Sequence, residues 1–425
     1  MLENQLNISD ELISKCIHCG LCLPTCPTYN LTFNEQSSPR GRIQLMKSVF
    51  ENTSTISKQF VDEMNFCLDC QACETACPAG VQYGSLVEEA RNLISIKGKE
   101  NTFYRIFKFI FLNKIIASTS NLKLASKFLR ILQNLFFINS SNQFLFRLFE
   151  KIKFLNALNL IPKIDLKPFD ENVPEFLPAF GIAKYNILFP YGCIMNVAFG
   201  DVHTDTVSVL RRAGCNVIIP KNQSCCGSLH KHNGEIGDAK NLAKQNIILF
   251  NKYKFDYLIQ NSSGCGAFMK EYDKLFQDDD RFSETAITFS KKCKDFSEFL
   301  VGIKYNPPNR ELNQKITYHD ACHLIHSQSI SKEPRQLISL LNKNGYIELN
   351  EASWCCGSAG IYNVTHTKDS LEILDRKMDN LINTQADIVI TNNPGCLLQL
   401  EYGIKKRKLN MKAMHLATLL NNLYK

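Results

Sequence analysis

Eight of the eighteen cysteines in this 425-residue chain fall in two short runs close to its start. Each run holds four cysteines within eleven residues, and a proline follows the last one. The runs are Cys16, Cys19, Cys22 and Cys26, and then Cys67, Cys70, Cys73 and Cys77. Three thiolates separated by two residues each can wrap one face of a cubane of four irons and four sulphides, which carries single electrons. The runs therefore predict two [4Fe-4S] clusters and a role in electron transfer.

The spacing of both runs is that of bacterial ferredoxins, in which the fourth cysteine of each run binds the other cluster. This cross-wiring predicts one cluster on Cys16, Cys19, Cys22 and Cys77, and the other on Cys67, Cys70, Cys73 and Cys26. Paired zinc knuckles are a weaker interpretation, because zinc sites usually use two cysteine pairs separated by a loop. Between the runs, Arg40 and Arg42 stand where a helix is expected to begin. They could shield cluster charge, grip a partner, or simply be solvated.

The other ten cysteines lie in residues 181–425, a segment that repeats itself. Each copy has a single cysteine, a Cys-Cys-Gly triplet and a later Gly-Cys. These cysteines are Cys193, Cys225, Cys226 and Cys265 in the first copy, and Cys322, Cys355, Cys356 and Cys396 in the second. The first gap is 32 residues in one copy and 33 in the other, and the second gap is 39 and 40. Such agreement predicts a duplicated domain.

Four thiolates in each copy can hold a further iron–sulphur cluster or a tetrahedral zinc ion, and metal binding is the favoured interpretation. His230, His319 and His323 stand close to these cysteines. They could ligate or tune a metal, carry protons, or only hold the cysteine loops by hydrogen bonds. Cys215 enters an apolar segment and is expected to be a buried core thiol. Cys293 has no counterpart in the second copy and is interpreted as incidental.

The elements that must position these cysteines differ along the chain. Residues 1–95 are expected to form a helical two-cluster domain, 96–180 basic amphipathic helices with a linker, and 181–305 and 306–425 the two copies. In each copy short β-branched runs, such as 217–220 and 347–349, alternate with helical patterns, such as 237–250 and 369–383. This alternation predicts α/β units with a mostly parallel sheet, and the cysteines follow strand ends, where ligands collect. The predicted fold class is multidomain, combining α+β and α/β parts.

The middle segment is strongly basic. Between Lys97 and Lys163, twelve Lys and Arg stand against two acids, Glu100 and Glu150. Apolar residues recur at helical spacing over 102–114, 124–136 and 144–155. Basic amphipathic helices can lie on anionic lipid, but packing on the first domain or on a partner subunit is the favoured interpretation. No motif supports nucleic-acid binding.

The N-terminus is polar and acidic, without the apolar region of a signal peptide. No segment approaches the roughly 18 apolar residues of a membrane span. So many cysteines without a secretion signal indicate a reducing compartment, where clustered thiols usually bind metal. The expected location is the cytoplasm, with peripheral attachment to the inner face of a membrane as the alternative.

The layout of two ferredoxin runs followed by two Cys-Cys-Gly copies resembles, over nearly the whole chain, the iron–sulphur subunit of glycolate oxidase (glycolate dehydrogenase). The stretches that carry the resemblance are Cys225-Cys226-Gly-Ser-Leu-His230, Ser263-Gly-Cys265-Gly-Ala-Phe-Met-Lys-Glu-Tyr272, His319-Asp-Ala-Cys322-His323 and Trp354-Cys-Cys-Gly-Ser-Ala-Gly360. The wider family includes cysteine-rich subunits of heterodisulfide reductases, the small subunit of anaerobic glycerol-3-phosphate dehydrogenase and lactate-utilisation proteins. In heterodisulfide reductases the motif ends in Cys-x-x-Cys, whereas Ser262 and Asn393 take the place of that first cysteine here. Disulfide chemistry is therefore disfavoured.

The resemblance implies an electron-transfer subunit of a glycolate dehydrogenase complex of the EC 1.1.99 type. A partner flavoprotein with FAD or FMN would oxidise glycolate to glyoxylate, and this chain would pass the electrons to a quinone or another membrane acceptor. The chain has no Gly-x-Gly-x-x-Gly after a strand and no phosphate-binding loop, so no substrate oxidation is expected from it alone. Lactate, glycerol-3-phosphate and other 2-hydroxy acids are alternative substrates. A heterodisulfide reductase-like subunit and a redox-sensing or assembly protein are alternative roles.

Overall fold

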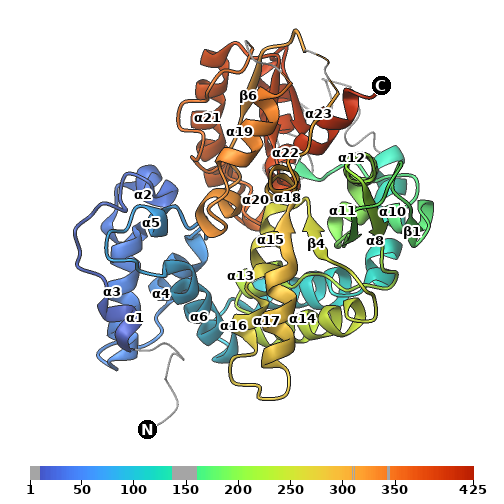
Figure 1. Ribbon diagram of the computed structural model, residues 1–425. Coiled ribbons are helices and arrows are strands. Elements are labelled where there is room, and N and C mark those ends of the chain that lie inside the picture. The colour runs from blue at the N-terminus through green and yellow to red at the C-terminus, as the bar shows by residue number, and fades with distance from the viewer. Residues whose placement is uncertain (1–9, 136–159, 309, 311, 342–344) are drawn as a thin grey trace.

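The computed structural model describes residues 10–135, 160–308, 310, 312–341 and 345–425. Figure 1 shows the N-terminal helices as one lobe (blue), the second Cys-Cys-Gly copy as another (orange to red), and the first copy with the linker helices as a third (cyan to yellow). We call the two copies the first repeat (181–305) and the second repeat (306–425). These boundaries, and those at 95 and 180, stay predictions.

The N-terminal lobe, residues 10–96, is built from helices and loops without a strand. Its helices are α1 (Asp10–Ser14), α2 (Pro27–Thr32), η1 (Glu35–Ser37), α3 (Pro39–Phe50), α4 (Lys58–Phe66), α5 (Ala72–Thr75) and α6 (Tyr83–Ile96). Ser38 accepts a hydrogen bond from the Gly41 N–H where α3 begins, and Ser57 accepts one from Phe60 where α4 begins. Apolar side chains of α3, α4 and α6 form one core. The two cysteine runs are the loop between α1 and α2 and the segment around α5.

The linker helices pack on the first repeat. They are α7 (Thr102–Lys108), the π-helical η2 (Phe109–Ile116) and α8 (Thr119–Leu135). Ile116 and Leu122 enter the core of the first repeat, and the buried Lys108 ammonium contacts Glu100 at 2.6 Å and Glu235 at 2.7 Å. The sequence favoured the first domain or a partner subunit as the packing surface, whereas the main apolar contact is with the first repeat. The pattern expected over 144–155 lies outside the described residues.

The sheet of the first repeat has five strands in the order β1-β3-β2-β4-β5, and its edge strand β1 comes from the segment before residue 181. Its strands are β1 (Phe176–Leu177), β2 (Tyr185–Leu188), β3 (Cys215–Ile218), β4 (Tyr257–Gln260) and β5 (Cys293–Asp295). All pairs are parallel except the edge pair of β1 and β3. Its helices are α11 (Ile194–Ala198), α12 (Gly200–Arg212), α13 (Ser228–His232), α14 (Ile236–Phe250), α15 (Ser263–Lys270), α16 (Tyr272–Leu275), α17 (Ser283–Lys292) and α18 (Phe296–Gly302), and α10 (Phe169–Asn172) precedes β1.

The second repeat has the parallel order β6-β7-β8. Its strands are β6 (Ile316–Tyr318), β7 (Ile388–Thr391) and β8 (Lys412–His415). Its helices are η4 (His323–Ser327), α19 (Lys332–Ser339), α20 (Tyr362–Thr365), α21 (Thr367–Thr384), α22 (Pro394–Arg407) and α23 (Leu416–Asn422). The strand predicted at 347–349 is wrong, because pairing at this edge is limited to a bridge between Ile316 and Tyr346. A turn ends the pairing, since the Ala352 N–H donates to the Leu349 carbonyl at 3.1 Å.

Both repeats share one strand order. In each copy the second element lies on one side of the first strand, and the third strand lies on its other side. The single cysteine of each copy follows the first strand and the last cysteine follows the third, so both lie at the point where the strand order reverses. The two sheets also share one core and exchange helices: α23 packs on α12, and α18 packs on α19. This reciprocal packing resembles a two-fold dimer made within one chain.

No helix within the described ranges is long and apolar enough to cross a bilayer.

Candidate iron–sulphur and thiolate sites

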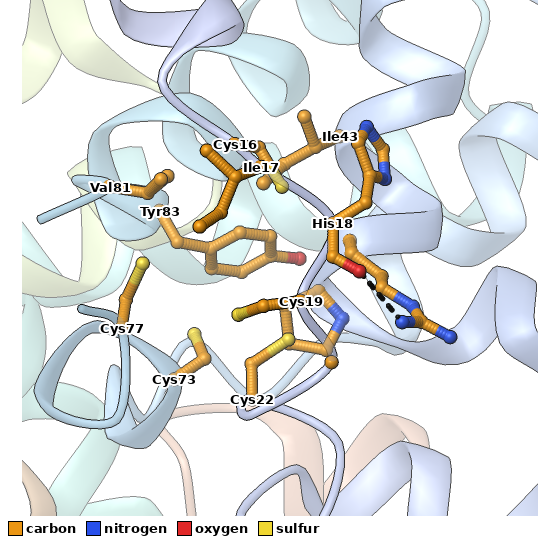
Figure 2. Close-up of a pocket in the computed structure, with 13 residues that line it drawn as sticks. Cys16, Ile17, His18, Cys19, Cys22, Ile43, Cys73, Cys77, Val81 and Tyr83 are labelled. Carbon is orange, nitrogen blue, oxygen red and sulfur yellow. Dashed lines mark hydrogen bonds between the residues drawn. The ribbon is translucent and has the colours of Figure 1, made fainter. Parts of the chain in front are cut away.

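The first cavity in the N-terminal lobe is lined by all four cysteines predicted for one cluster. These are Cys16, Cys19, Cys22 and Cys77, with Cys73 of the other set beside them. Figure 2 shows Cys19, Cys22, Cys73 and Cys77 around a common space beside the Tyr83 ring. Gly20 has φ +85°, and a Cβ there would come within 2.8 Å of Arg40 Nη1. Arg40 in turn donates to the His18 carbonyl at 3.0 Å, so it holds this cysteine loop.

A second cavity adjoins the first and is lined by the other four cysteines, Cys26, Cys67, Cys70 and Cys73. Pro39, Cys73 and Tyr83 line both cavities, so the two sites share a wall. The structure thus brings each cross-wired set together. The two fourth cysteines, Cys77 and Cys26, come from the opposite run in each case.

The donor set and its surroundings fit two cubane clusters. Burial raises the pKa of the Cys70 and Cys73 thiols well above their usual range, so these residues favour the thiolate form only beside positive charge. Arg42, fully buried on the second cavity, supplies such charge and is fixed by the Glu63 carbonyl at 2.7 Å. The Asp69 N–H also donates to Cys67 Sγ at 3.3 Å. The alternative of a solvated Arg42 is thus wrong, whereas shielding of cluster charge stays a prediction, because the guanidinium also pairs with Glu63 at 3.3 Å.

The four thiols of the first repeat form a continuous string from Cys193 through Cys225 and Cys226 to Cys265. Cys226 Sγ and Cys265 Sγ are 3.2 Å apart. Hydrogen bonds from Cys193 and Cys226 hold the pKa of Cys225 well below its usual range, against the raising effect of burial. The Cys225 thiol is therefore more acidic than its neighbours Cys193 and Cys226, whose pKa is raised.

The thiols of the second repeat form a matching string from Cys322 through Cys355 and Cys356 to Cys396. Here the pKa of Cys322, Cys355 and Cys356 is raised, to which thiol–thiol contacts and burial both contribute. A buried cation faces them: Lys377 donates to the Glu351 carbonyl and, at 3.1 Å, to the Ala352 carbonyl. No motif marks Lys377 in the sequence, where it is one more polar residue of a segment with a helical pattern.

The place of the missing fifth cysteine is filled in both repeats by a hydrogen-bonding side chain. Asn393 Nδ2 donates to Cys396 Sγ at 3.6 Å, and Ser262 hydrogen-bonds Cys265. These residues touch the last thiol of each string but offer no fifth thiolate. Neither repeat therefore has the five thiolates of the heterodisulfide reductase motif.

The three histidines singled out in the sequence take different positions. His230 Nε2 donates to the Leu112 carbonyl of η2 at 3.1 Å and lies beside Cys225. His323 Nε2 donates to the Asp69 carbonyl in the second cysteine run at 2.9 Å. His319 is buried, and neither ring nitrogen has a hydrogen-bond partner among the described residues.

The Cys67–Cys77 run lies where the N-terminal lobe meets both repeats. From the second repeat, Ser327 Oγ donates to Gln71 at 2.6 Å, and Cys322 and Cys355 lie in the same apolar cluster as Cys70. From the first repeat, His232 Nδ1 contacts Asp69 at 2.9 Å and Glu88 at 2.7 Å. This junction was missed from the sequence, because its members are single residues far apart in the chain.

Two cysteines lie outside these sites. Cys215 begins β3, is fully buried, and burial raises its pKa to about 12, as expected of a core thiol. Cys293 begins β5, is also buried, and its pKa is raised by burial. Its thiol donates to the Phe289 carbonyl at 3.5 Å, and it lies in the same buried apolar cluster as Cys225 and Cys226.

Comparison with known proteins defines the class of this chain. Residues 12–81 match the family described as "4Fe-4S dicluster domain", and residues 187–270 and 316–401 each match "Cysteine-rich domain". The chain is thus an iron–sulphur protein with a two-cluster domain and a duplicated cysteine-rich domain. This confirms the predicted fold class and the two [4Fe-4S] clusters.

The relatives narrow that class to a family. The chain is 39% identical over 417 residues to the probable glycolate oxidase iron–sulphur subunit of Bacillus subtilis, covering 96% of this chain and 93% of that protein. It is 28% identical over 402 residues to the glycolate oxidase iron–sulphur subunit of Escherichia coli, covering 91% and 89%. With lactate utilization protein A of Halalkalibacterium halodurans it shares 32% identity over 231 residues, 54% of this chain and 94% of that protein. The chain belongs to the family of glycolate oxidase iron–sulphur subunits.

Proposed function

We propose that this chain is the electron-transfer subunit of a 2-hydroxy acid oxidase complex whose substrate is glycolate. The observation that carries the proposal is the 39% identity with the Bacillus subtilis subunit over 93% of that protein. A flavin-bearing partner subunit oxidises glycolate to glyoxylate, and this chain accepts the electrons. The [4Fe-4S] clusters supply single-electron transfer, which suits a position between a two-electron flavin and a further acceptor.

The proposed cluster ligands are the two cross-wired sets of cysteines. Their surroundings favour one direction of electron flow. Cys19 is exposed, and the apolar side chains of Ile17 and Leu21 beside it are exposed as well, which suits the approach of a partner. Cys26 and Cys73 are buried and face the interior. Electrons therefore enter at the Cys16 set and move to the Cys67 set, at the junction with the two repeats.

A membrane quinone is the proposed acceptor, and the linker helices support it. Their outward side chains combine large apolar groups with exposed cations at Arg105, Lys114 and Lys127, and residues 101–135 contain no acid. The exposed apolar residues are Phe103, Ile106, Phe107, Phe109, Ile110, Leu124, Phe128 and Ile131. A surface that is both apolar and cationic is complementary to anionic lipid. The hydrogen bond from His230 to Leu112 joins these helices to the thiols of the first repeat, which is thus the proposed acceptor end.

The complex is tested by purifying the full chain with its partners from its own host without oxygen. We expect a flavoprotein in stoichiometric amount, and clusters that are reduced on addition of glycolate, as seen by electron paramagnetic resonance. The same preparation is then given L-lactate, D-lactate and glycerol-3-phosphate. Absence of a flavoprotein contradicts the complex, whereas reduction by lactate but not glycolate contradicts the substrate alone.

Lactate is the second candidate substrate, because the cysteine-rich protein of lactate utilization shares 32% identity with about half of this chain. Glycolate is preferred, since the glycolate oxidase subunits align with nearly the whole chain. The ratio of kcat/KM for the two acids decides between them.

Membrane contact is tested by sedimenting the complex with vesicles of phosphatidylcholine alone or with added phosphatidylglycerol. Phe103, 82% exposed, and Phe128, 63% exposed, are both replaced by Asp. Two buried aromatic groups are lost from the bilayer, so binding to anionic vesicles should fall roughly tenfold or more. Ile182, 86% exposed on the first repeat, is the matched control, because Ile182→Asp leaves the linker helices intact. Equal binding to both vesicle types would contradict the proposal.

A further inference from the structure

His319 is the buried side chain whose position the proposed function does not explain. It directly follows β6, is 0% exposed, and neither ring nitrogen has a hydrogen-bond partner in the part of the chain that the structure describes. The Ala352 carbonyl lies near the ring but forms no hydrogen bond of normal geometry with either nitrogen. In the first repeat Pro190 holds this place, three residues before the single cysteine. Burying a polar group without a hydrogen-bond partner costs free energy, and a bound metal ion is one way to offset that cost.

The atoms that face His319 are thiol sulphurs. The ligand atoms of His319, Cys356 and Cys396 all lie within 4.8 Å of one another, and all three residues are buried. Cys355 hydrogen-bonds Cys356 and is the next donor in line. A tetrahedral zinc ion with bonds of about 2.0–2.3 Å places its donors about 3.3–3.8 Å apart. Small side-chain adjustments would therefore close four donors around one ion.

The first repeat lacks this arrangement. Among the described residues, no three of its cysteine and histidine ligand atoms lie that close together, and its thiols form an open string. Its nearby histidine, His230, already donates to the Leu112 carbonyl. The two N-terminal cavities differ again, because there the cysteines surround open space of the kind that a cubane needs.

The charges of the second repeat also suit a single divalent cation. Three thiolates, one neutral imidazole and Zn²⁺ carry a net charge of −1, which the buried Lys377 ammonium can offset.

We propose that the second repeat binds one zinc ion through His319, Cys356, Cys396 and Cys355, and that the first repeat does not. This goes beyond the proposed function and does not depend on the substrate. Zinc has no redox chemistry, so its role is to fix the Cys-Cys loop and η4, which touch the Cys67 run. The second repeat then stabilises the surroundings of the cluster proposed on the Cys67 set.

The test uses the full chain with its partners, purified without oxygen in the presence of a chelator that removes loosely held zinc. Metal analysis should give one zinc per chain, together with at least the roughly eight irons of two [4Fe-4S] clusters. Zinc K-edge absorption should show three sulphur neighbours near about 2.3 Å and one nitrogen near about 2.0 Å. Less than about one fifth of a zinc per chain, or a shell of sulphur alone, would overturn the proposal.

Matched variants separate the ligand from a folding effect. His319→Gln should lose most of the zinc, whereas His319→Cys should keep it with four sulphur neighbours. His230→Gln, the control in the first repeat, should keep the zinc and its nitrogen neighbour. The electron paramagnetic resonance of the N-terminal clusters reports whether each variant is folded. Full zinc in a folded His319→Gln variant, with the nitrogen neighbour retained, would overturn the assignment.

Discussion

The two repeats share a frame but not the surroundings of their thiols. Both have the same strand order and four cysteines at the same places. Yet the second repeat has His319 where the first has Pro190, and a buried Lys377 where the first has Asn246. Duplication preserved what positions the thiols and changed what touches them. One chain can therefore carry two sites with different chemistry on one fold.

The largest expected difference follows from removing one thiol in each repeat. Cys356→Ser takes a proposed zinc ligand, so we expect loss of zinc and a fall of about 3–5 kcal/mol in the free energy of unfolding. Cys226→Ser removes the matching thiol on the proposed acceptor side. There we expect a smaller stability loss. Because four thiolates can hold a further iron–sulphur cluster, loss of one ligand should lower electron delivery to a quinone analogue by roughly 10–100-fold.

Denaturant unfolding and quinone reduction by the purified complex measure these two effects. The comparison depends on their separation: stability for the second repeat, electron delivery for the first. If both variants lose the same property to the same extent, the repeats have one function in common, and the different residues around their thiols do not change that function.

The second expected difference concerns the buried residues at one matching helical position, Lys377 on α21 and Asn246 on α14. Lys377 bonds two carbonyls of the loop before the triplet, and Asn246 bonds the Cys225 carbonyl at 2.9 Å. Lys377→Asn makes the second repeat like the first. It removes a charged donor from the Glu351 and Ala352 carbonyls, which keep only the Trp354 and Asp320 N–H groups, so we expect a cost of about 1.5–3 kcal/mol and weaker zinc retention.

Asn246→Leu is the control, with a similar cost in stability and no change in zinc content. Thermal unfolding and metal analysis of both variants check this. A Lys377→Asn protein with unchanged zinc would show that the ammonium serves only the loop carbonyls, and not the charge of the thiolates.

The frame could be predicted from the sequence far better than these contacts. Equal cysteine gaps identified the duplication, and alternation of β-branched runs with helical patterns gave the parallel sheets. The segments Cys293–Asp295 and Lys412–His415 were missed as strands, because they are short and carry charged residues among the apolar ones. Their pairing is imposed by the sheet and by tertiary packing, which overrides weak local preference.

The contacts at the junction could not be predicted for a different reason. His232, Asp69 and Glu88 meet across more than 140 residues, and no local pattern marks them. The cross-wired cysteine sets could be predicted because the spacing of the two runs is itself a motif. His319 was accessible only as one of three histidines, since its lack of a partner is a property of the folded structure.

The third expected difference is the pH dependence of the contacts that each repeat makes with the N-terminal lobe. Burial alone would lower the pKa of His232, but its bonds to Asp69 and Glu88 raise it to about 9. A raised histidine pKa stabilises the fold fully below about pH 6.5, and the contribution, roughly 2–3 kcal/mol, is lost as pH rises through 9. The first repeat should therefore loosen from the N-terminal lobe in alkali.

The second repeat contacts the same lobe through His326, which bonds Thr75 at 2.8 Å and whose pKa burial lowers to about 4. A lowered histidine pKa has the opposite sign: stability is present above about pH 6.5 and is lost as pH falls toward 4. Hydrogen–deuterium exchange at pH 5, 7 and 9.5, corrected for intrinsic rates, should show α13 opening in alkali and η4 opening in acid. Both segments opening at the same end of the range would contradict this assignment.

The smallest expected effects are at the place where the two repeats agree. Ser262 and Asn393 each hydrogen-bond the last thiol of their string, so Ser262→Ala and Asn393→Ala remove one weak bond apiece. We expect about 0.5–1.5 kcal/mol for each in thermal unfolding, with metal content unchanged. The effects should be nearly equal, because both residues replace the same missing cysteine without taking over its role as a ligand. A loss of iron or zinc in only one of the two variants would show that its side chain holds the metal directly, and the comparison would then have to include a fifth donor in that repeat.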